Sequence, residues 1–263
     1  MYTYLSFLLF LFMFPLVAHV EEIDHFHKLA QLATQDTLVL IDIDDTIFIP
    51  AQTLGSDVWY GSRFEKYKAE GLSQIEAKER ALAEIRAVRQ LTKVELVEPD
   101  TNKVIDELQQ RGIFCLGVTA QGLALATETV RHLNGLGVDF SKSVPFDPTD
   151  GYFLNNNHGV LFRQGVLFTS GTAKFSSIAL LLKDKGYQPK AIILIDDKEK
   201  HVVDMDAFCQ KEGSPFEGIP FLGLRYSFSD ARIQAFDERL AEYQWNHSTF
   251  SHILSDAEAK AAL

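Results

Sequence analysis

Two continuous apolar runs, each ending at a carboxylate, narrow the folds open to this chain more than any other feature. Residues 37–42 read Thr-Leu-Val-Leu-Ile-Asp, and residues 191–196 read Ala-Ile-Ile-Leu-Ile-Asp. Strands that helices cover on both faces have such unbroken apolar sequences, whereas half-exposed antiparallel strands alternate. The two runs therefore predict central strands of a parallel sheet, and weaker runs at 113–118 and 221–226 predict two more strands.

Helical patterns lie between and after these strands, at residues 99–111, 122–134, 173–185 and 198–211. This alternation of strand and helix predicts an α/β fold with a doubly wound, mostly parallel sheet. A chain of 263 residues has room for one such domain with insertions, but not for two domains of ordinary size.

Two stretches are longer than a simple crossover requires. Residues 51–96 contain a charged helical region interrupted by Gly71, and residues 148–170 contain short apolar pieces around an Asn-Asn-Asn-His-Gly sequence. The first stretch predicts a small helical cap insertion, and the second predicts a β-hairpin insertion. The core domain is then expected over residues 19–50 and 97–250.

The first eighteen residues differ from the rest of the chain. From Leu5 to Ala18 only Ser6 is polar, and charged residues begin at Glu21. This apolar segment is too short to span a bilayer easily but suits the core of a signal peptide. We interpret residues 1–18 as a signal peptide of an exported protein, periplasmic or secreted, with no stable membrane span after cleavage. A buried N-terminal helix and a retained membrane anchor are the alternatives.

The balance of charges argues against nucleic acid as a partner. The 25 basic and 36 acidic residues give a net charge of −11, which disfavours nucleic-acid binding because such binding relies on basic patches. A phosphorylated substrate stays compatible, since a bound metal ion reverses the local potential. Cys115 and Cys209 could pair in an oxidising compartment, but we interpret them as two buried thiols because Cys115 lies within a predicted strand. No spacing of Cys and His suggests zinc. The oligomeric state stays open.

Polar side chains follow three of the predicted strands. Asp42 and Asp44 end the first, Thr119 ends another, and Asp196 and Asp197 end a third. Ligands of open α/β sheets bind outside the carboxyl ends of the strands, so these residues are expected at one edge. Neighbouring carboxylates repel each other, and a hard divalent cation relieves that cost. An all-oxygen site of few carboxylates indicates Mg²⁺.

Asp42 and Asp44 are two residues apart on an extended chain, so both side chains face the same way. One carboxylate can then attack a bound group while the other exchanges protons with the leaving group or water. The alternative for this pair is a strand-ending turn capped by carboxylates, and for Thr119 alone it is a helix N-cap.

The sequence from Asp42 to Ile47, Asp-Ile-Asp-Asp-Thr-Ile, resembles the first motif, DxDxT, of the haloacid dehalogenase (HAD) superfamily. Thr119, then Lys174 at the head of a helix, then Asp196 and Asp197 resemble the second, third and fourth motifs in the family's order. The resemblance covers residues 36–227 and implies a HAD-like Rossmannoid core. More narrowly, the chain is similar to a poorly characterised group of exported bacterial HAD-like proteins.

The resemblance implies a magnesium-dependent phosphatase that acts on a small phosphorylated substrate. Asp42 is then the nucleophile that forms an aspartyl-phosphate, and Asp44 is the general acid and later the base. Thr119 hydrogen-bonds a phosphoryl oxygen, and Lys174 offsets negative charge.

The same resemblance implies a ligand set for the metal ion. The carboxylates of Asp42 and Asp197 and the backbone carbonyl of Asp44 hold Mg²⁺, with Asp196 nearby to orient Lys174 or a water. Asp45 is interpreted as a turn residue rather than a ligand, and His201 as a structural or supporting residue.

Two other functions fit the same residues. A phosphotransferase would pass the phosphoryl group to an alcohol, and a binding protein would keep the fold without turnover. In the cap, Trp59, Tyr60 and Arg63 are candidates for substrate contact. His25 and His27 could indicate a metal site, but we interpret them as part of a solvated N-terminal segment.

Overall fold

The computed structural model describes residues 19–263, so the signal peptide predicted for residues 1–18 lies outside the described residues. The main sheet has eight strands in the order β1-β10-β9-β2-β5-β8-β7-β6. Neighbours from β1 to β8 are parallel, and β7 and β6 are antiparallel. The strands are β1 (His19–Ile23), β2 (Thr37–Asp42), β5 (Phe114–Thr119), β6 (Gly151–Asn155), β7 (His158–Arg163), β8 (Val166–Phe168), β9 (Ala191–Asp196) and β10 (Phe221–Tyr226).

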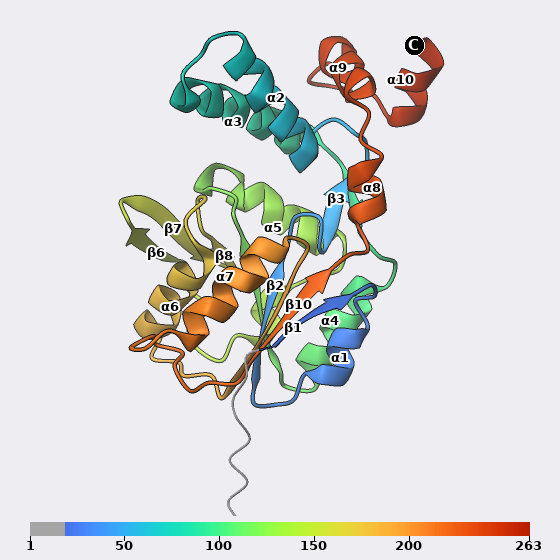
Figure 1. The fold of residues 1–263 in the computed structure, drawn as a ribbon. Helices are drawn as coiled ribbons and strands as arrows, with labels where there is room; N and C mark the ends of the chain where they lie inside the picture. The colour runs from blue at the N-terminus through green and yellow to red at the C-terminus, as the bar shows by residue number, and fades with distance from the viewer. Residues whose placement is uncertain (1–18) are drawn as a thin grey trace, which may run out of the picture.

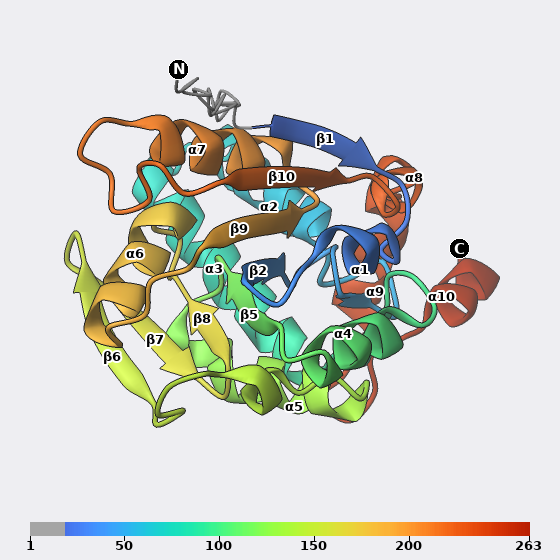
Figure 2. The same ribbon diagram turned by 90° about the horizontal axis from the view of Figure 1, so that it is seen from below.

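Helices cover both faces of this sheet (Figure 2), which confirms the predicted doubly wound α/β class. Val39 and Ile41 of β2 pack into the core beneath α1, α4 and α5, and Leu38 and Leu40 pack into the core beneath α6 and α7. All four side chains are fully buried, which explains the unbroken apolar run. These helices are α1 (Lys28–Leu32), α4 (Thr101–Gln110), α5 (Ala126–Gly135), α6 (Lys174–Asp184) and α7 (Glu199–Gln210), with short 3₁₀ turns at Leu123–Leu125 and Phe140–Ser143.

The predicted hairpin is formed by β6 and β7. Its turn residues Asn156 and Asn157 have φ values of 48° and 65°, as a two-residue hairpin turn requires. A second tight turn at Gln164 and Gly165 then returns the chain as β8 alongside β5. Gly165 has φ of 75°, and a Cβ there would lie 2.4 Å from the carbonyl carbon of Phe140, so only glycine fits.

The helical insertion leaves the core through a two-stranded antiparallel sheet of β3 (Phe48–Pro50) and β4 (Val94–Leu96). Between these strands lie α2 (Asp57–Ala69) and α3 (Gln74–Leu91). The two helices stand above the carboxyl ends of the main strands, where Figure 1 shows them as a layer separate from the core. Gly71, with φ of 95°, lies in the turn that separates α2 from α3.

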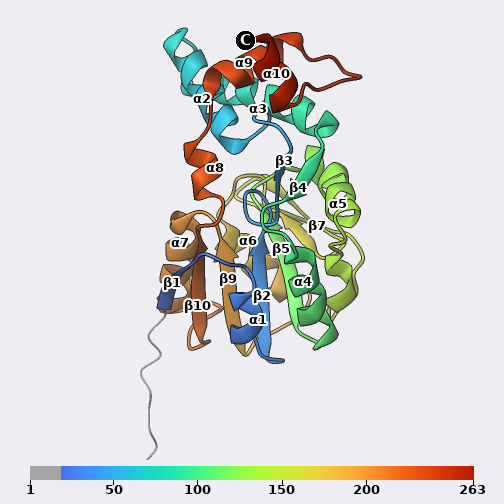
Figure 3. The same cartoon turned by 90° about the vertical axis from the view of Figure 1, so that its right-hand side faces the viewer.

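The C-terminal segment joins this cap, which differs from the expected core boundary at residue 250. It forms α8 (Asp230–Gln234), α9 (Glu238–His247) and α10 (Asp256–Ala262), and it crosses from the core to the cap along α8 (Figure 3). Gln244 Oε1 accepts from the backbone N–H of Leu54 at 2.9 Å, and Asp256 accepts from that of Thr53 at 2.7 Å. The boundary was missed because these partners lie about 190 and 203 residues apart in the sequence.

Both cysteines are buried and free, as predicted. Burial raises the pKa of the Cys115 and Cys209 thiols to about 12, which leaves both thiols protonated and unreactive at neutral pH. Within residues 19–263, no helix combines the length and apolarity that a bilayer crossing needs.

Candidate active site

The turn after β2 brings the first motif to the edge of the sheet. Asp42 is the last residue of β2, and Asp45 takes a left-handed conformation with φ of 59°, which confirms its interpretation as a turn residue. Thr46 Oγ1 donates to Asp42 Oδ2 at 3.1 Å and accepts from the backbone N–H of Asp197 at 3.1 Å. The threonine therefore ties the ends of β2 and β9 together.

Three buried carboxylates meet at this point. One oxygen each of Asp42, Asp196 and Asp197 lies within 4.8 Å of the others, and all three residues are buried. Burial and the charge of Asp42 raise the pKa of Asp197 to about 9, and burial and the charge of Asp196 raise the pKa of Asp42 to about 6. The Oδ1 atom of Asp197 is buried without a hydrogen-bond partner. Without a cation, Asp42 and Asp197 thus hold their protons more tightly than free carboxyl groups do.

Lys174 partly balances that charge. It is the first residue of α6, and its Nζ donates to Asp42 Oδ1 and, at 2.6 Å, to Asp196 Oδ2. Although burial alone would raise the pKa of Asp196, Lys174 and His201 lower it to about 2. His201 Nδ1 lies 3.0 Å from both oxygens of Asp196. The backbone N–H of Lys198 donates to Asp196 Oδ1 at 2.9 Å. Asp196 is therefore the ionised carboxylate that orients Lys174.

Asp44 points to a different set of partners. Its Oδ2 accepts from Thr119 Oγ1 at 2.8 Å, and its Oδ1 accepts from Gln121 Nε2 at 2.7 Å and from Arg89 at 3.1 Å. Thr119 also accepts from the backbone N–H of Gln121 at 3.0 Å. The carboxylate of Asp44 is thus held beside the acidic cluster rather than within it.

The structure brings the predicted site residues together at the carboxyl ends of β2, β5 and β9. Among them, Thr119 contacts Asp44, and Lys174 contacts Asp42. Asp197 contacts the same turn through Thr46. The set is Asp42, Asp44, Thr119, Lys174, Asp196 and Asp197.

The sequence reasoning missed the cap's contribution to this site. Arg89 of α3 donates to Asp44, and at 2.7 Å to Asp57 at the start of α2. Lys198, from the core, donates to the other oxygen of Asp57. Burial alone would raise the pKa of Asp57, but Lys198 and Arg89 hold it well below its usual range. Two of these residues could have been found from the sequence, because Lys198 directly follows the acidic pair and Gln121 lies two residues after Thr119. Nothing in the sequence distinguished Arg89 from the other charged residues of its helix.

Comparison with known proteins places the chain in a family. Residues 17–260 match the model of the family described as "Protein of unknown function (DUF2608)". The chain belongs to this family. A protein of Chlamydia pneumoniae named "Putative outer membrane protein" is 27% identical over 242 residues, which are 88% of this chain and 86% of that protein. A protein of the same name from Chlamydia trachomatis serovar D is 23% identical and covers 84% of this chain and 85% of its own length.

Solved structures with a related arrangement include hydrolases of the family that the motifs resemble. A haloacid dehalogenase-like hydrolase from Streptococcus pneumoniae has 15% sequence identity and a TM-score of 0.44. It covers 73% of this chain and 95% of its own chain.

The acidic cluster of this DUF2608 protein fits a hard divalent cation. Its available donors are all oxygens, which Mg²⁺ prefers. Asp197 Oδ1 lacks a partner, and the raised pKa values of Asp42 and Asp197 mark a deficit of positive charge. A cation beside these two carboxylates would remove both costs.

Two cap residues considered for substrate contact lie inside the cap instead. Trp59 is fully buried, and Arg63 is 5% exposed. Arg63 pairs with Glu84 of α3 at 2.7 Å and with Glu242 of α9 at 2.9 Å. These side chains hold α2, α3 and α9 of the DUF2608 protein together, so their role in the structure is to build the cap.

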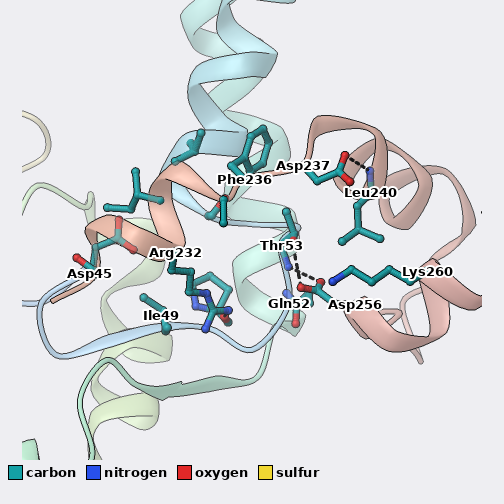
Figure 4. A pocket seen from close by; sticks show the side chains of 16 residues that line it. Asp45, Ile49, Gln52, Thr53, Arg232, Phe236, Asp237, Leu240, Asp256 and Lys260 are labelled. Carbon is teal, nitrogen blue, oxygen red and sulfur yellow. Dashed lines mark hydrogen bonds between the residues drawn. The ribbon is translucent and has the colours of Figure 1, made fainter.

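A cavity of about 300 Å³ lies beside the first motif, between β3, the start of α2 and the C-terminal segment. In Figure 4, Asp45, Arg232, Phe236 and Asp256 surround it from different elements. Burial and the charges of Asp57 and Asp44 raise the pKa of Asp45 to about 7. The cavity therefore has mixed polar and apolar walls where the cap meets the core.

Proposed function

We propose that the protein hydrolyses phosphomonoesters of small molecules through an aspartyl-phosphate on Asp42. The observation that carries this proposal is the Asp42 carboxylate, which accepts from the ammonium group of Lys174 and lies within 4.8 Å of a carboxylate oxygen of Asp197, a residue whose buried Oδ1 has no partner. A cation bound by these carboxylates would, together with Lys174, neutralise an incoming phosphoryl group, which is what phosphoryl transfer requires of a protein.

In the first step, an Asp42 oxygen attacks phosphorus, and the bond from phosphorus to the leaving oxygen breaks. Asp44 gives its proton to that oxygen, and the product alcohol leaves. In the second step, water attacks the aspartyl-phosphate, Asp44 takes a proton from the water, and inorganic phosphate and Asp42 are released. Asp44 suits both steps because Thr119 and Gln121 fix its carboxylate.

Mg²⁺ would be held by the carboxylates of Asp42 and Asp197 and by the backbone carbonyl of Asp44. When bound, it supplies positive charge that offsets the charge of the phosphoryl group. Asp196 holds Lys174 in place, and Lys174 fixes the orientation of the Asp42 carboxylate by donating to its Oδ1 atom. The hydroxyl of Thr119, which donates to Asp44 in this structure, lies beside the reacting groups and would turn to donate to a phosphoryl oxygen of the substrate.

The test is hydrolysis of p-nitrophenyl phosphate by the purified protein with Mg²⁺, with EDTA, and as the Asp42→Asn variant. We expect turnover that EDTA and Asp42→Asn abolish. Asp36→Asn is the matched control, because Asp36 is an exposed carboxylate just before β2 whose partner is Lys190. A folded wild-type protein that is inactive on a broad panel of phosphate esters would contradict the proposal and favour a binding protein. Alcohol acceptors in the same assay distinguish hydrolysis from phosphoryl transfer.

We also propose that the protein acts outside the cytoplasm. The apolar segment at residues 1–18 and the names of the chlamydial relatives support export. Cell fractionation should recover a mature form that starts near residue 19 outside the cytoplasm. Deletion of residues 2–18 should retain the protein in the cytoplasm, and an unchanged distribution would contradict the proposal.

A further inference from the structure

Two histidines near the N-terminus lie beside a glutamate from a distant part of the chain. One ligand atom each of His25, His27 and Glu98 lies within 4.8 Å of the others. The imidazole rings of His25 and His27 have centroids 5.6 Å apart, and His25 Nδ1 lies 2.9 Å from Glu98 Oε1. None of the three belongs to the acidic cluster around Asp42.

The backbone places both histidines on the same side. Phe26, between them, is 1% exposed and packs edge-on against the ring of the fully buried Tyr226, with centroids 5.9 Å apart. His25 and His27, on either side of the buried Phe26, are both exposed. His25 is 47% exposed, so its ring has room to rotate toward an ion.

Glu98 is already oriented for a ligand. Its Oε2 accepts from the backbone N–H of Phe26 at 2.7 Å and from the hydroxyl of Tyr226 at 2.8 Å. These two donors occupy one carboxylate oxygen and direct the other, Oε1, toward His25. Carboxylate ligands of metal ions are commonly held by hydrogen bonds in this way, and such support raises affinity.

We propose that His25, His27 and Glu98 form a transition-metal site whose best match is Zn²⁺. Two imidazoles and one carboxylate suit zinc, whereas nitrogen ligands disfavour Mg²⁺. Zinc ligands at bond lengths of about 2.0–2.1 Å lie roughly 3.3 Å apart, so small rotations of the exposed rings complete the geometry. The ion replaces the hydrogen bond between His25 and Glu98 and leaves a coordination position open to solvent. This site is independent of the proposed phosphatase activity.

The experiment titrates Co²⁺ into the full-length protein, purified without a histidine tag and kept in millimolar Mg²⁺. We expect a visible absorption band of low-symmetry Co²⁺ that Zn²⁺ abolishes. His25→Ala and His27→Ala should each weaken Co²⁺ and Zn²⁺ binding by about 10-fold or more, and Tyr226→Phe, which removes only a hydroxyl, should weaken it by about 10-fold. His158→Ala is the matched control, because it removes an exposed histidine from β7.

An Asp197→Asn variant separates this site from the acidic cluster, and it should retain the Co²⁺ band and the Zn²⁺ affinity. Circular dichroism of each variant confirms that the fold is intact. A band that survives in the His25→Ala/His27→Ala double variant overturns the proposal, as does a band that disappears in Asp197→Asn. Absence of Co²⁺ and Zn²⁺ binding by the wild-type protein overturns it as well.

Discussion

At the scale of single residues, the ammonium group of Lys174 is shared between Asp42 and Asp196 in a place that water scarcely reaches. Side-chain exposures there are 6% for Lys174, 6% for Asp42 and 0% for Asp196. A charge in such surroundings depends on its partners, because removal of one partner leaves the other buried and uncompensated. These buried carboxylates thus make the stability of this protein sensitive to one lysine.

Replacement of Lys174 by methionine should therefore destabilise the protein and inactivate it. We expect a loss of roughly 3–5 kcal/mol in the free energy of unfolding, measured by urea denaturation without Mg²⁺. The rate of phosphate release should fall by about 10²–10³-fold, since a group that stabilises the transition-state charge is lost. Lys190→Met, at an exposed pair with Asp36, should change neither quantity measurably. Equal behaviour of the two variants would contradict this account of Lys174.

The raised pKa of Asp197 predicts how the stability of the protein depends on pH. Its pKa is raised to about 9 in the folded protein, against about 3.9 in an unfolded chain. Between these values the folded state keeps a proton that the unfolded state has lost. The contribution of Asp197 to the free energy of unfolding therefore falls as the pH rises from about 4 to about 9. Asp42, with its pKa raised to about 6, acts in the same direction over a narrower range.

Urea unfolding in EDTA from pH 5 to pH 9 checks this sign. The Asp197→Asn variant should lose much of the slope and should be more stable than the wild type at pH 8. Asp206→Asn, which changes a half-buried carboxylate of α7 outside the acidic cluster, should keep the wild-type slope. Millimolar Mg²⁺ should stabilise the wild-type protein most at high pH, because it favours the ionised carboxylates. A wild-type slope in Asp197→Asn would show that other groups set the pH dependence.

At the scale of elements, helix α3 reaches the candidate active site from the cap. Arg89 donates to Asp44 in the core, to Asp57 at the start of α2 and, at 3.0 Å, to the carbonyl of Gly55. Lys198 donates to Asp57 from the opposite direction. Asp57 thus links a cap helix and a core loop, and the side chains of Arg89 and Lys198 hold the cap against the candidate site.

Arg89→Met should loosen that contact. We expect faster hydrogen exchange in residues 51–57 and in the first turn of α2, measured by mass spectrometry in the absence of substrate. Arg86→Met, one turn earlier on an exposed position of the same helix, is the control and should exchange like the wild type. Unchanged exchange in Arg89→Met would mean that apolar packing alone keeps the cap closed.

The helices and strands also show how much of the fold and of the candidate site could be predicted from the sequence. The four predicted strands and four predicted helices were readable because burial on both faces leaves a continuous apolar run, and covering helices keep their own periodicity. Strand β1, His-Val-Glu-Glu-Ile, has no such run because it lies at the edge of the sheet beside β10 alone. The predicted site residues sat at strand ends with carboxylates, whereas the part played by Arg89 depends on a fold that brings residues 45 apart in the chain together.

At the scale of the whole molecule, the cap is assembled from two distant segments. Leu54, Trp59 and Val88 of the insertion pack with Ala241 of α9, and the rings of Trp59 and Trp245 lie 5.5 Å apart. Glu242 and Asp256 add polar contacts to Arg63 and Thr53 across the same boundary. The insertion alone would therefore leave part of its apolar surface exposed to water.

Removal of residues 237–263 should unfold the cap while the core keeps its sheet. We expect an early thermal transition, or loss of the α2 and α3 signals in hydrogen exchange, together with increased binding of a hydrophobic dye. Asp256→Asn tests the polar part of this contact. It should lower the melting temperature by a few degrees, since it weakens acceptance from Thr53 and Gln244. Full protection of α2 and α3 in the truncated chain would contradict the shared cap.

The two-part cap has a consequence for the order of events as the chain is made. Thr53 leaves the ribosome early, but its partner Asp256 is separated from it by 203 residues. The core sheet can form once β10 has been synthesised, whereas the cap is complete only after α9 and α10 have been synthesised. Until then, the ring of Trp59 lacks its contact with Trp245. A nascent chain that stalls before residues 237–263 have been synthesised would thus carry an assembled candidate site beneath an incomplete cap, a form that chaperones and proteases can recognise.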